Sequence, residues 1–387
     1  MFIQRKAETK LKELTNSRKI LILLGARQVG KTTLIKHFLK EKKAVFLNFD
    51  NESDRSHFIS ASALSPVMAI KTLGKPDFIV IDEAQRLVET GQVVKGWFDA
   101  EVTTKIILLG SSSLNLLNQS AESLTGRNEK IFLPPLTFSE IIATQSWFSE
   151  HFSEEQIQTS FSKQIASLLW QTMIFGCYPE AWLINDKQNF LLNLVSDYLL
   201  KDVLQLGLIK NPILIKKLLS LLAYQAGAEV SVSELSTALG MSRVTVEKYL
   251  DLLEQTFVIF RLPAFGKNPR REITKNQKIY FWDNGIRNAI LNEFSTNNSR
   301  PDLGQLWENW VVSEVAKNNL LDGKRKNLYF WRPRGGSSEV DLIIKENEKI
   351  SAFEIKWRKK NINKKAFEIQ YQTKVKLIDS SNPLLVF

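Results

Sequence analysis

The chain of 387 residues contains one cysteine, Cys177, and three histidines, His37, His57 and His151. A single cysteine excludes an intrachain disulfide, and so few cysteines and histidines cannot supply the ligands of a structural zinc cluster. We therefore expect neither a disulfide framework nor a zinc site. We interpret these four residues as ordinary core or surface residues.

Long apolar runs are also missing from the sequence. The purely apolar stretches reach only five or six residues, whereas a membrane-spanning helix needs roughly 20. The first residues, MFIQRKAE, carry charges of both signs and no apolar core of a secretory signal. We expect a cytoplasmic protein with no membrane segment.

The charge balance and the length set broad limits on function. With 52 Lys and Arg against 41 Asp and Glu, the net charge is +11, which favours a polyanionic partner such as nucleic acid. Solvated lysine faces produce the same balance, so this indication is weak by itself. A chain of this length is too large for one ordinary core, and we expect two to four domains.

The most informative motif is the segment GARQVGKT at residues 25–32. It has the G-x-x-x-x-G-K-T spacing of a phosphate-binding loop, in which loop amides and a helix N-terminus attract phosphate oxygens. Lys31 is expected to reach the β and γ phosphates, and the Thr32 hydroxyl to bind Mg²⁺. An apolar run precedes the loop and an amphipathic segment follows it, as the motif requires. The predicted contacts of the loop with ATP are Gly25, Ala26, Arg27, Gln28, Val29, Gly30, Lys31, Thr32 and Thr33.

A second acidic element supports this prediction. The run FIVIDE at residues 78–83 is an apolar strand that ends in two acids. Asp82 is expected to hold the Mg²⁺, and Glu83 is expected to polarise the attacking water. We therefore predict ATP and Mg²⁺ as cofactors.

Residues 18 to about 145 alternate between strand-like and helix-like patterns, which predicts a parallel sheet with helices on both faces. The predicted strands cover residues 20–24, 44–50, 78–81, 105–110 and 130–133. Ligands of such sheets bind at the carboxyl ends of the strands, and both Gly25 and Asp82 fall there. From 150 to 225 the alternation is lost, and helical spacing predicts a helical lid or connector.

Residues 231–253 read as a capped short helix, a glycine turn and a second capped helix, the pattern of a helix-turn-helix. Residues 257–263 and 278–282 would be wing strands, which together predict a winged helix. Arg243, Thr245 and Lys248 could face a DNA groove, but Glu247 and Asp251 on the same helix would repel phosphate. DNA binding and protein contact both stay open. The predicted wing tip carries Lys267, Arg270, Arg271 and Lys275.

The last part of the chain begins again as an α/β unit. A helix at 304–315 is followed by a strand at 328–332 and by a hairpin whose strands are 339–344 and 350–357. Glu354 and Lys356 are two residues apart on a strand and therefore share a face, and a suitable register places Asp341 beside them. Two carboxylates and a lysine on one face can form a metal-dependent phosphodiester hydrolysis site, completed by Glu308 from the helix. A solvent-facing Glu–Lys pair gives the same pattern, so both interpretations stay open.

Three further sequence words complete a resemblance to a known family. They are GCYPE at 176–180, KIYFWDNG at 278–285 and EVD at 339–341. Together with the phosphate loop and Asp82-Glu83, in this order, they resemble the archaeal-ATPase-like AAA+ proteins of prokaryotes. In that family the carboxy-terminal region is a PD-(D/E)XK restriction-endonuclease-like domain. The resemblance spans nearly the whole chain and implies an AAA+ module with a capacity to form homo-oligomers.

The resemblance also implies roles for individual residues. Ser111 to Ser113 match the sensor position that reads the γ phosphate, and Arg127 in Thr125-Gly126-Arg127 is the candidate arginine finger. An exposed surface arginine is the competing interpretation of Arg127. Residues that fill the acid and lysine positions of the nuclease pattern are Glu308, Asp341, Glu354 and Lys356, with Asp341 and Glu354 as metal ligands. Such a domain can also persist as a nucleic-acid-binding or structural fold.

The implied fold class is α/β, with four segments. These are an AAA+ phosphate-loop ATPase domain at 1–148, a helical connector at 149–225, a winged helix at 226–292 and a nuclease-like domain at 300–387. The primary hypothesis is a DNA-associated ATPase with a metal-dependent nuclease site. The alternative is an ATP-dependent switch or scaffold whose later domains bind only protein or DNA. A nucleotide kinase would share the phosphate loop but leave the winged helix and the last domain without a role.

Overall fold

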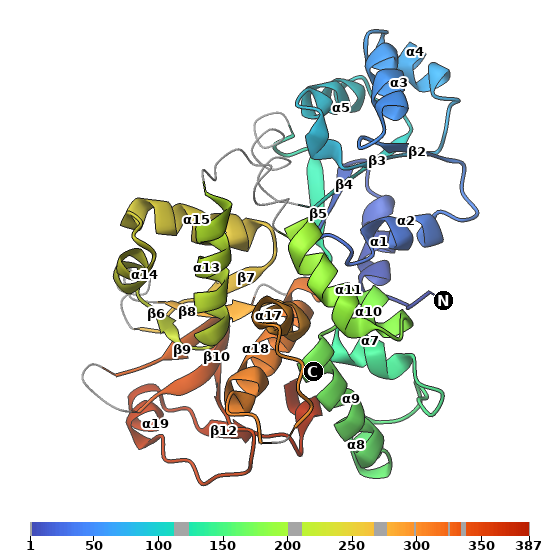
Figure 1. Cartoon of the computed structure of the whole chain (residues 1–387). Coiled ribbons are helices and arrows are strands. Elements are labelled where there is room, and N and C mark those ends of the chain that lie inside the picture. Colours follow the sequence, from blue (N-terminus) through green and yellow to red (C-terminus); the bar gives the residue numbers. More distant parts are fainter. Residues whose placement is uncertain are drawn as a thin grey trace. The chain divides into compact units, whose positions relative to one another are not determined.

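The computed structural model describes residues 2–111, 124–199, 211–266, 277–297, 299–323, 326–333 and 338–386 (Figure 1). The chain forms two compact units, Phe2–Pro134 and Pro135–Phe387. The boundary between the two units falls after Pro134. The predicted connector, winged helix and last domain therefore all lie in the larger unit. Within the ranges given above, no helix has the length and apolar character that a membrane-spanning helix requires.

The smaller unit is built on a parallel sheet of five strands in the order β2-β3-β4-β1-β5. All five residues of β1 are buried, as expected for a central strand covered on both faces. The predicted sheet is confirmed, although β2 and β5 each end earlier than expected. The elements are α1 (Ala7–Thr15), β1 (Ile20–Leu24), α2 (Lys31–Phe38), β2 (Ala44–Asn48), α3 (Glu52–Ser62), α4 (Pro66–Thr72), β3 (Phe78–Asp82), η1 (Ala84–Arg86), α5 (Thr90–Asp99), β4 (Lys105–Gly110) and β5 (Asn128–Phe132).

The larger unit begins with helices. A capping box formed by Thr137 and Glu140 starts the first of them. Within the predicted helical connector, an α-helix ends at Asn193 and a π-helical turn begins at Leu194. The helices are α7 (Phe138–Ala143), α8 (Glu154–Ser160), α9 (Ser162–Phe175), α10 (Pro179–Leu183), α11 (Lys187–Asn193) and the π-helical turn η2 (Leu194–Leu199).

The elements expected for a helix-turn-helix with wing strands follow. Ser231 caps α14, Gly240 ends it in the left-handed conformation at φ 62°, and Ser242 caps α15. The three strands form an antiparallel sheet in the order β6-β8-β7. The predicted wing-tip cations fall outside the described residues. The elements are α13 (Pro212–Tyr224), β6 (Glu229–Val230), α14 (Val232–Leu239), α15 (Arg243–Gln255), β7 (Ile259–Leu262), β8 (Gln277–Phe281) and α17 (Asn284–Leu291).

The last elements form a four-stranded mixed sheet in the order β12-β11-β10-β9. The predicted hairpin is confirmed as β10 and β11, and β11 pairs with β12 in parallel. The predicted helix is longer at its carboxyl end and stops at Leu321. The elements are α18 (Leu303–Leu321), β9 (Asn327–Trp331), β10 (Val340–Glu346), β11 (Lys349–Ile355), α19 (Lys365–Tyr371), β12 (Val375–Ile378) and η3 (Pro383–Val386).

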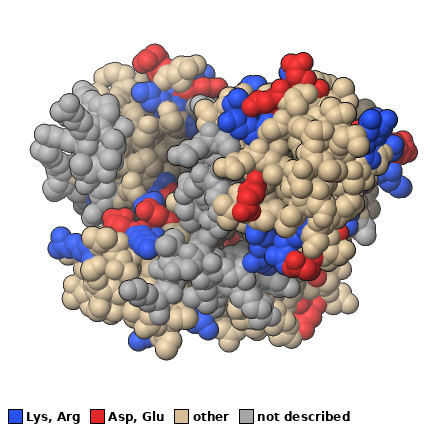
Figure 2. Space-filling model, turned by 90° about the horizontal axis from the view of Figure 1, so that it is seen from above, with Lys and Arg blue, Asp and Glu red and all other residues tan. Residues whose placement is uncertain are grey.

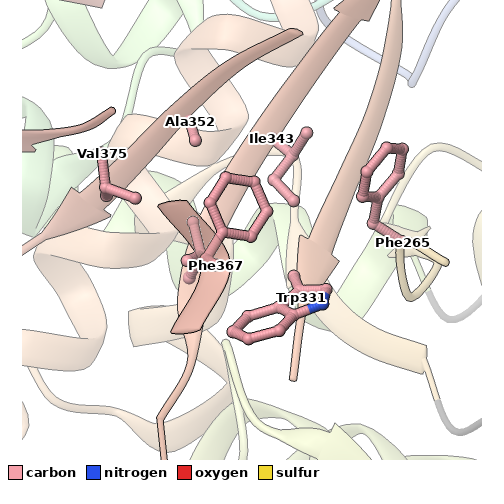
Figure 3. Packing of buried hydrophobic residues seen from close by; sticks show 7 residues of the cluster. Phe265, Trp331, Ile343, Ala352, Phe367 and Val375 are labelled. Atoms are coloured by element: carbon pink, nitrogen blue, oxygen red, sulfur yellow. The ribbon is translucent and has the colours of Figure 1, made fainter. Parts of the chain in front are cut away.

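The wing sheet and the last sheet share a core. Phe265, which follows β7, packs with Trp331, Ile343 and Phe367 of the last domain (Figure 3). The amide of Phe265 also donates to the carbonyl of Phe330 in β9 at 2.6 Å. The segment that follows β7 therefore packs into the core of the last domain.

Candidate nucleotide site and carboxy-terminal acid cluster

The phosphate loop lies between β1 and α2, as the motif requires. Its first glycine leaves no room for a side chain, since a Cβ on Gly25 would lie 2.2 Å from the carbonyl oxygen of Leu133. Gly30 adopts φ 92° immediately before α2, a conformation that glycine reaches without strain. The backbone that would cradle phosphates therefore depends on both glycines.

The Lys31 side chain contacts the backbone of the phosphate loop that precedes it. Its Nζ donates to the carbonyl oxygens of Gly25 and Ala26 at 2.8 and 2.9 Å, and the residue is 6% exposed. This places the ammonium group at the concave side of the loop, where a phosphate oxygen would meet it. The two glycines and the lysine are therefore suited to bind phosphate.

A direct hydrogen bond joins the two residues that are expected to bind Mg²⁺. The Thr32 hydroxyl donates to Oδ2 of Asp82 at 2.6 Å, and Oδ1 of Asp82 accepts from the amide of Glu83 at 2.9 Å. A hydroxyl beside a carboxylate supplies the oxygen ligands that Mg²⁺ prefers. Residues 32 and 82 are thus brought together as the sequence predicts, and they could hold Mg²⁺.

Glu83 is held in a defined position next to this pair. Its backbone is left-handed, at φ 51°, an uncommon conformation that is enriched at active sites. Its carboxylate accepts a hydrogen bond from the side-chain amide of Gln85 and lies 3.5 Å from the hydroxyl of Ser111. The predicted sensor Ser111, at the end of β4, is therefore beside the predicted catalytic acid. Ser112 and Ser113 lie outside the described residues.

Arg5 is a residue of this site that the sequence did not reveal. It is 4% exposed, and its guanidinium donates to the carbonyl oxygens of Val29 and Pro134 at 2.8 and 2.6 Å. Arg5 thus ties the back of the phosphate loop to the segment that leaves β5. No motif surrounds Arg5, so only the fold identifies it.

Arg127 lies away from the phosphate loop. Its carbonyl accepts from the amide of Ile20 at the start of β1, whereas the loop follows the end of that strand. Five residues of strand separate the two places, about 16 Å at 3.3 Å per residue. Its guanidinium binds Asp99 at 2.7 Å, and this hydrogen bond lowers the pKa of the Asp99 carboxyl. The structure does not bring Arg127 to the loop of its own chain.

The predicted nuclease residues converge in the larger unit. The register pairs Leu342 with Phe353, so Asp341 comes opposite Glu354. Nζ of Lys356 lies 2.9 Å from Glu354 and 3.2 Å from Asp341. A cavity of about 400 Å³ is lined by all four predicted residues and by Lys278, Glu339 and Lys364. We name the four carboxylates of Glu308, Glu339, Asp341 and Glu354 the acid cluster.

The sequence did not reveal Lys278, Glu339 and Lys364 as members of this site. Lys278 on β8 lies 2.9 Å from Glu308 and 3.9 Å from Asp341, and it also forms an ion pair with Glu339. Lys364 lies 2.8 Å from Glu354. Every carboxylate of the acid cluster therefore contacts a lysine. In the described part of the chain, no group of three Asp, Glu, His or Cys residues is arranged to hold a metal ion.

Burial and charge shift the protonation of these groups. Burial by itself lowers the pKa of Lys278, but Glu308, Asp341 and Glu339 outweigh it, so the pKa is raised above the ordinary lysine value. Burial raises the pKa of Glu308, although Lys278 opposes this effect. Tyr280 donates its hydroxyl to Glu308 at 2.8 Å, and burial beside that carboxylate raises its pKa. The surrounding carboxylates thus favour the charged form of Lys278.

Comparison with known protein families gives a match that covers most of the smaller unit. A model described as "AAA domain" matches residues 17–142, which span the phosphate loop, Asp82 and Arg127. This segment is similar to AAA domains. Two further models, described as domains of unknown function DUF8612 and DUF4143, match residues 166–297 and 303–386. The AAA part of the expected resemblance is confirmed, and neither of the other descriptions names a nuclease.

Similar proteins occur in bacteria and archaea. The uncharacterized protein Rv2008c of Mycobacterium tuberculosis is 28% identical over 92% of this chain and 74% of its own length. The uncharacterized protein MJ1544 of Methanocaldococcus jannaschii is 27% identical over 90% of this chain and 78% of its own length. The Walker-type ATPase of Pyrococcus abyssi has a similar fold, with a TM-score of 0.51 and 15% identity over 75% of this chain and 96% of that one.

Proposed function

We propose that this chain binds and hydrolyses ATP with Mg²⁺ and uses the state of the nucleotide to control how its larger unit engages a partner. The observation that carries the proposal is the 2.6 Å contact of Thr32 with Asp82, because it joins the phosphate loop to the second acidic element. Within an AAA domain these two residues come from motifs that serve one metal ion. ATP is the expected substrate.

The residues of the site would have different roles in the binding and hydrolysis of ATP. The loop amides and Lys31 would bind and orient the phosphates, and Thr32 with Asp82 would hold Mg²⁺. When bound, Mg²⁺ supplies positive charge to the β and γ oxygens as negative charge develops there. Glu83 would orient the attacking water and accept its proton, and its contacts with Gln85 and Ser111 keep the carboxylate in place.

Release of inorganic phosphate from Mg²⁺–ATP tests this proposal. We expect steady turnover by the unmodified protein and none above background for Lys31→Ala. Lys36→Ala is the matched control, since Lys36 lies on the same helix but is exposed, and it should retain full turnover. Equal turnover by the Lys31 and Lys36 variants would reject the assigned site.

We propose DNA as the first partner to test. The net charge of +11 and the predicted helix-turn-helix support this choice. Glu247 and Asp251 on α15, which were expected to repel phosphate, both form ion pairs with Arg261 of β7. On the face drawn in Figure 2, the described cations are interspersed with Asp and Glu. The proposal therefore rests on α15 more than on a broad basic surface.

Fluorescence anisotropy with a labelled duplex, with and without ATP, tests the partner. Arg243→Ala with Lys248→Ala should weaken binding at every sequence and lower the salt dependence by about one ion per cation removed. Lys217→Ala on α13 is the control, because this lysine is also exposed. Absence of binding at low salt would reject DNA and favour a protein partner, which co-purification with and without ATP would detect.

A second candidate function is phosphodiester cleavage by Glu308, Asp341, Glu354 and Lys356. The observation that favours it is their convergence on one cavity. Incubation with DNA forms and Mg²⁺ or Mn²⁺ would reveal cleavage, and Asp341→Ala should abolish it. Cleavage that persists in Asp341→Ala would assign the activity elsewhere. The lysines that bridge the acid cluster count against this candidate, because each carboxylate already contacts an ammonium group.

A further inference from the structure

Lys278 occupies an unusual place in the larger unit. Its side chain is 4% exposed and reaches from β8 into the acid cluster, which otherwise comes from α18, β10, β11 and the residue before β10. Three carboxylates, those of Glu308, Glu339 and Asp341, surround its Nζ within 4 Å. Oxygen atoms from several carboxylates around one point are also what a divalent cation requires.

The backbone keeps Lys278 in this place. Residue 278 pairs with Glu229 of β6 on one side and with Leu262 of β7 on the other, so it lies on the central strand of its sheet. Three residues further along, the amide of Phe281 donates to Oδ1 of Asn309 at 2.8 Å, and Nδ2 of Asn309 donates back to the Phe281 carbonyl. Strand β8 is thus fastened to α18, the helix that carries Glu308.

Glu308 is hydrogen-bonded to two side chains of β8. Its Oε1 accepts hydrogen bonds from both Lys278 and Tyr280. These two residues share one face of β8 because they are two positions apart on the strand. Gly227 closes the site from another side, because a Cβ there would lie 3.2 Å from Oε1 of Glu308. A metal ion that used Oε1 of Glu308 would have to displace both donors from this half-buried carboxylate.

The net charge of the acid cluster also depends on Lys278. The four carboxylates of the acid cluster face three ammonium groups, those of Lys278, Lys356 and Lys364, which leaves one net negative charge. Lys278 is the most buried of these three cations, whereas the Lys356 side chain is 38% exposed. Removing Lys278 would leave two net negative charges around an empty position, which is the charge that a divalent cation balances.

We infer that Lys278 is the resident cation of the acid cluster and excludes a divalent metal ion from the carboxylates around it. A metal-dependent nuclease site, which the sequence resemblance implies, does not fit the residues as they are arranged. The inference concerns metal binding and does not depend on ATP hydrolysis. It also stands apart from DNA binding by α15, so failure of either proposal leaves it intact.

Manganese binding to the full chain, without nucleotide, tests the inference by electron paramagnetic resonance. All variants carry Asp82→Asn, so that the phosphate-loop site lacks its carboxylate metal ligand. With Lys278 present we expect no Mn²⁺ site that is sensitive to Asp341→Asn. Lys278→Met should gain one Mn²⁺ site at least ten-fold tighter than any in the parent, and Asp341→Asn in that background should remove it.

Two further variants sharpen the result. Lys364→Met removes a lysine from the same cavity but leaves Lys278 in place, so it should gain no Mn²⁺ site. Because Lys278→Met leaves carboxylates unpaired, its melting temperature should be low without metal and should rise with Mn²⁺. If Lys278→Met is not folded, Lys278→Gln serves in its place, since it removes the charge and keeps a donor to Glu308.

Either of two results would overturn the inference. One is a Mn²⁺ site in the parent that Asp341→Asn abolishes, which would show that metal and Lys278 coexist and would strengthen the nuclease candidate. The other is a folded Lys278 variant that gains no Mn²⁺ site, which would show that some other feature excludes metal.

Discussion

The hydroxyl of Thr32, in the first turn of α2, donates a 2.6 Å hydrogen bond to Oδ2 of Asp82 at the end of β3. The two residues are separated by 50 positions in the chain and meet because β3 and β1 both flank β4 in the parallel sheet. Their contact joins two short motifs into one site. The ATP-dependent function proposed for the AAA domain depends on this relationship.

The contribution of Thr32 should appear only when Mg²⁺ is present. Thr32→Val keeps the shape of the side chain but removes the hydroxyl, so the affinity for Mg²⁺–ATP should fall roughly ten-fold, or about 1.4 kcal/mol. In excess chelator the affinity for ATP should be unchanged. Titration of a fluorescent ATP analogue in both conditions measures the difference. A loss of the same size in both conditions would assign Thr32 to phosphate or to folding.

Glu83 should affect turnover rather than binding. Because the carboxylate is expected to accept the proton of the attacking water, Glu83→Gln should lower the single-turnover rate by about 100-fold or more. ATP should stay bound, since the phosphate contacts are intact. Glu89→Gln, at an exposed position nearby, should hydrolyse ATP at the normal rate. Unchanged turnover in Glu83→Gln would require another base.

Arg127 is predicted to act on a neighbouring copy of the chain, because it lies at the opposite edge of the sheet from its own phosphate loop. Arg127→Ala should bind ATP normally and lose turnover by about 1,000-fold, as for other arginine fingers. Mixing it with Lys31→Ala should restore part of the activity, since each variant supplies what the other lacks. Normal turnover in Arg127→Ala alone would make it a surface arginine paired with Asp99.

A buried ion pair is predicted to hold the start of the larger unit. Nζ of Lys317 lies 2.7 Å from Glu314 and donates to the carbonyl of Leu136, while Glu314 accepts from the amide of Phe138 at 2.8 Å. Lys317→Met leaves the Glu314 carboxylate buried without its cation, which should cost about 3–5 kcal/mol of unfolding free energy.

Urea unfolding measures this loss from the transition midpoint. Lys317→Met with Glu314→Gln removes both charges and should recover part of the lost stability. A double variant that is as unstable as the sum of the single variants would mean that the two charges act independently.

The sequence was sufficient for features that arise locally. The strand, glycine turn and helix around Lys31 form a contiguous pattern, and the hairpin that places Asp341 opposite Glu354 follows from two alternating runs and a short turn. The helix-turn-helix caps at Ser231 and Ser242 are equally local signals. Each of these predictions needs only short-range periodicity and capping chemistry.

The parts that the sequence did not reveal depend on packing between distant segments. Lys278 reads as an ordinary residue of a wing strand, and only the docking of β8 on α18 brings it to Glu308. Arg5 reaches the phosphate loop through hydrogen bonds to Val29 and Pro134, which are distant from it in the sequence. Arg127 was assigned from a motif, and a motif carries no information about which edge of the sheet it occupies. The positions of Lys278, Arg5 and Arg127 depend on how distant elements pack together, which residue type alone does not determine.

Binding of ATP to the phosphate loop is the central claim, and isothermal titration calorimetry measures it most directly. We predict that the full chain takes up one Mg²⁺–ATP per AAA domain and that Lys31→Ala, which remains folded by circular dichroism, takes up none. Absence of any heat of binding with well-folded unmodified protein, or equal binding by Lys31→Ala, would contradict the account.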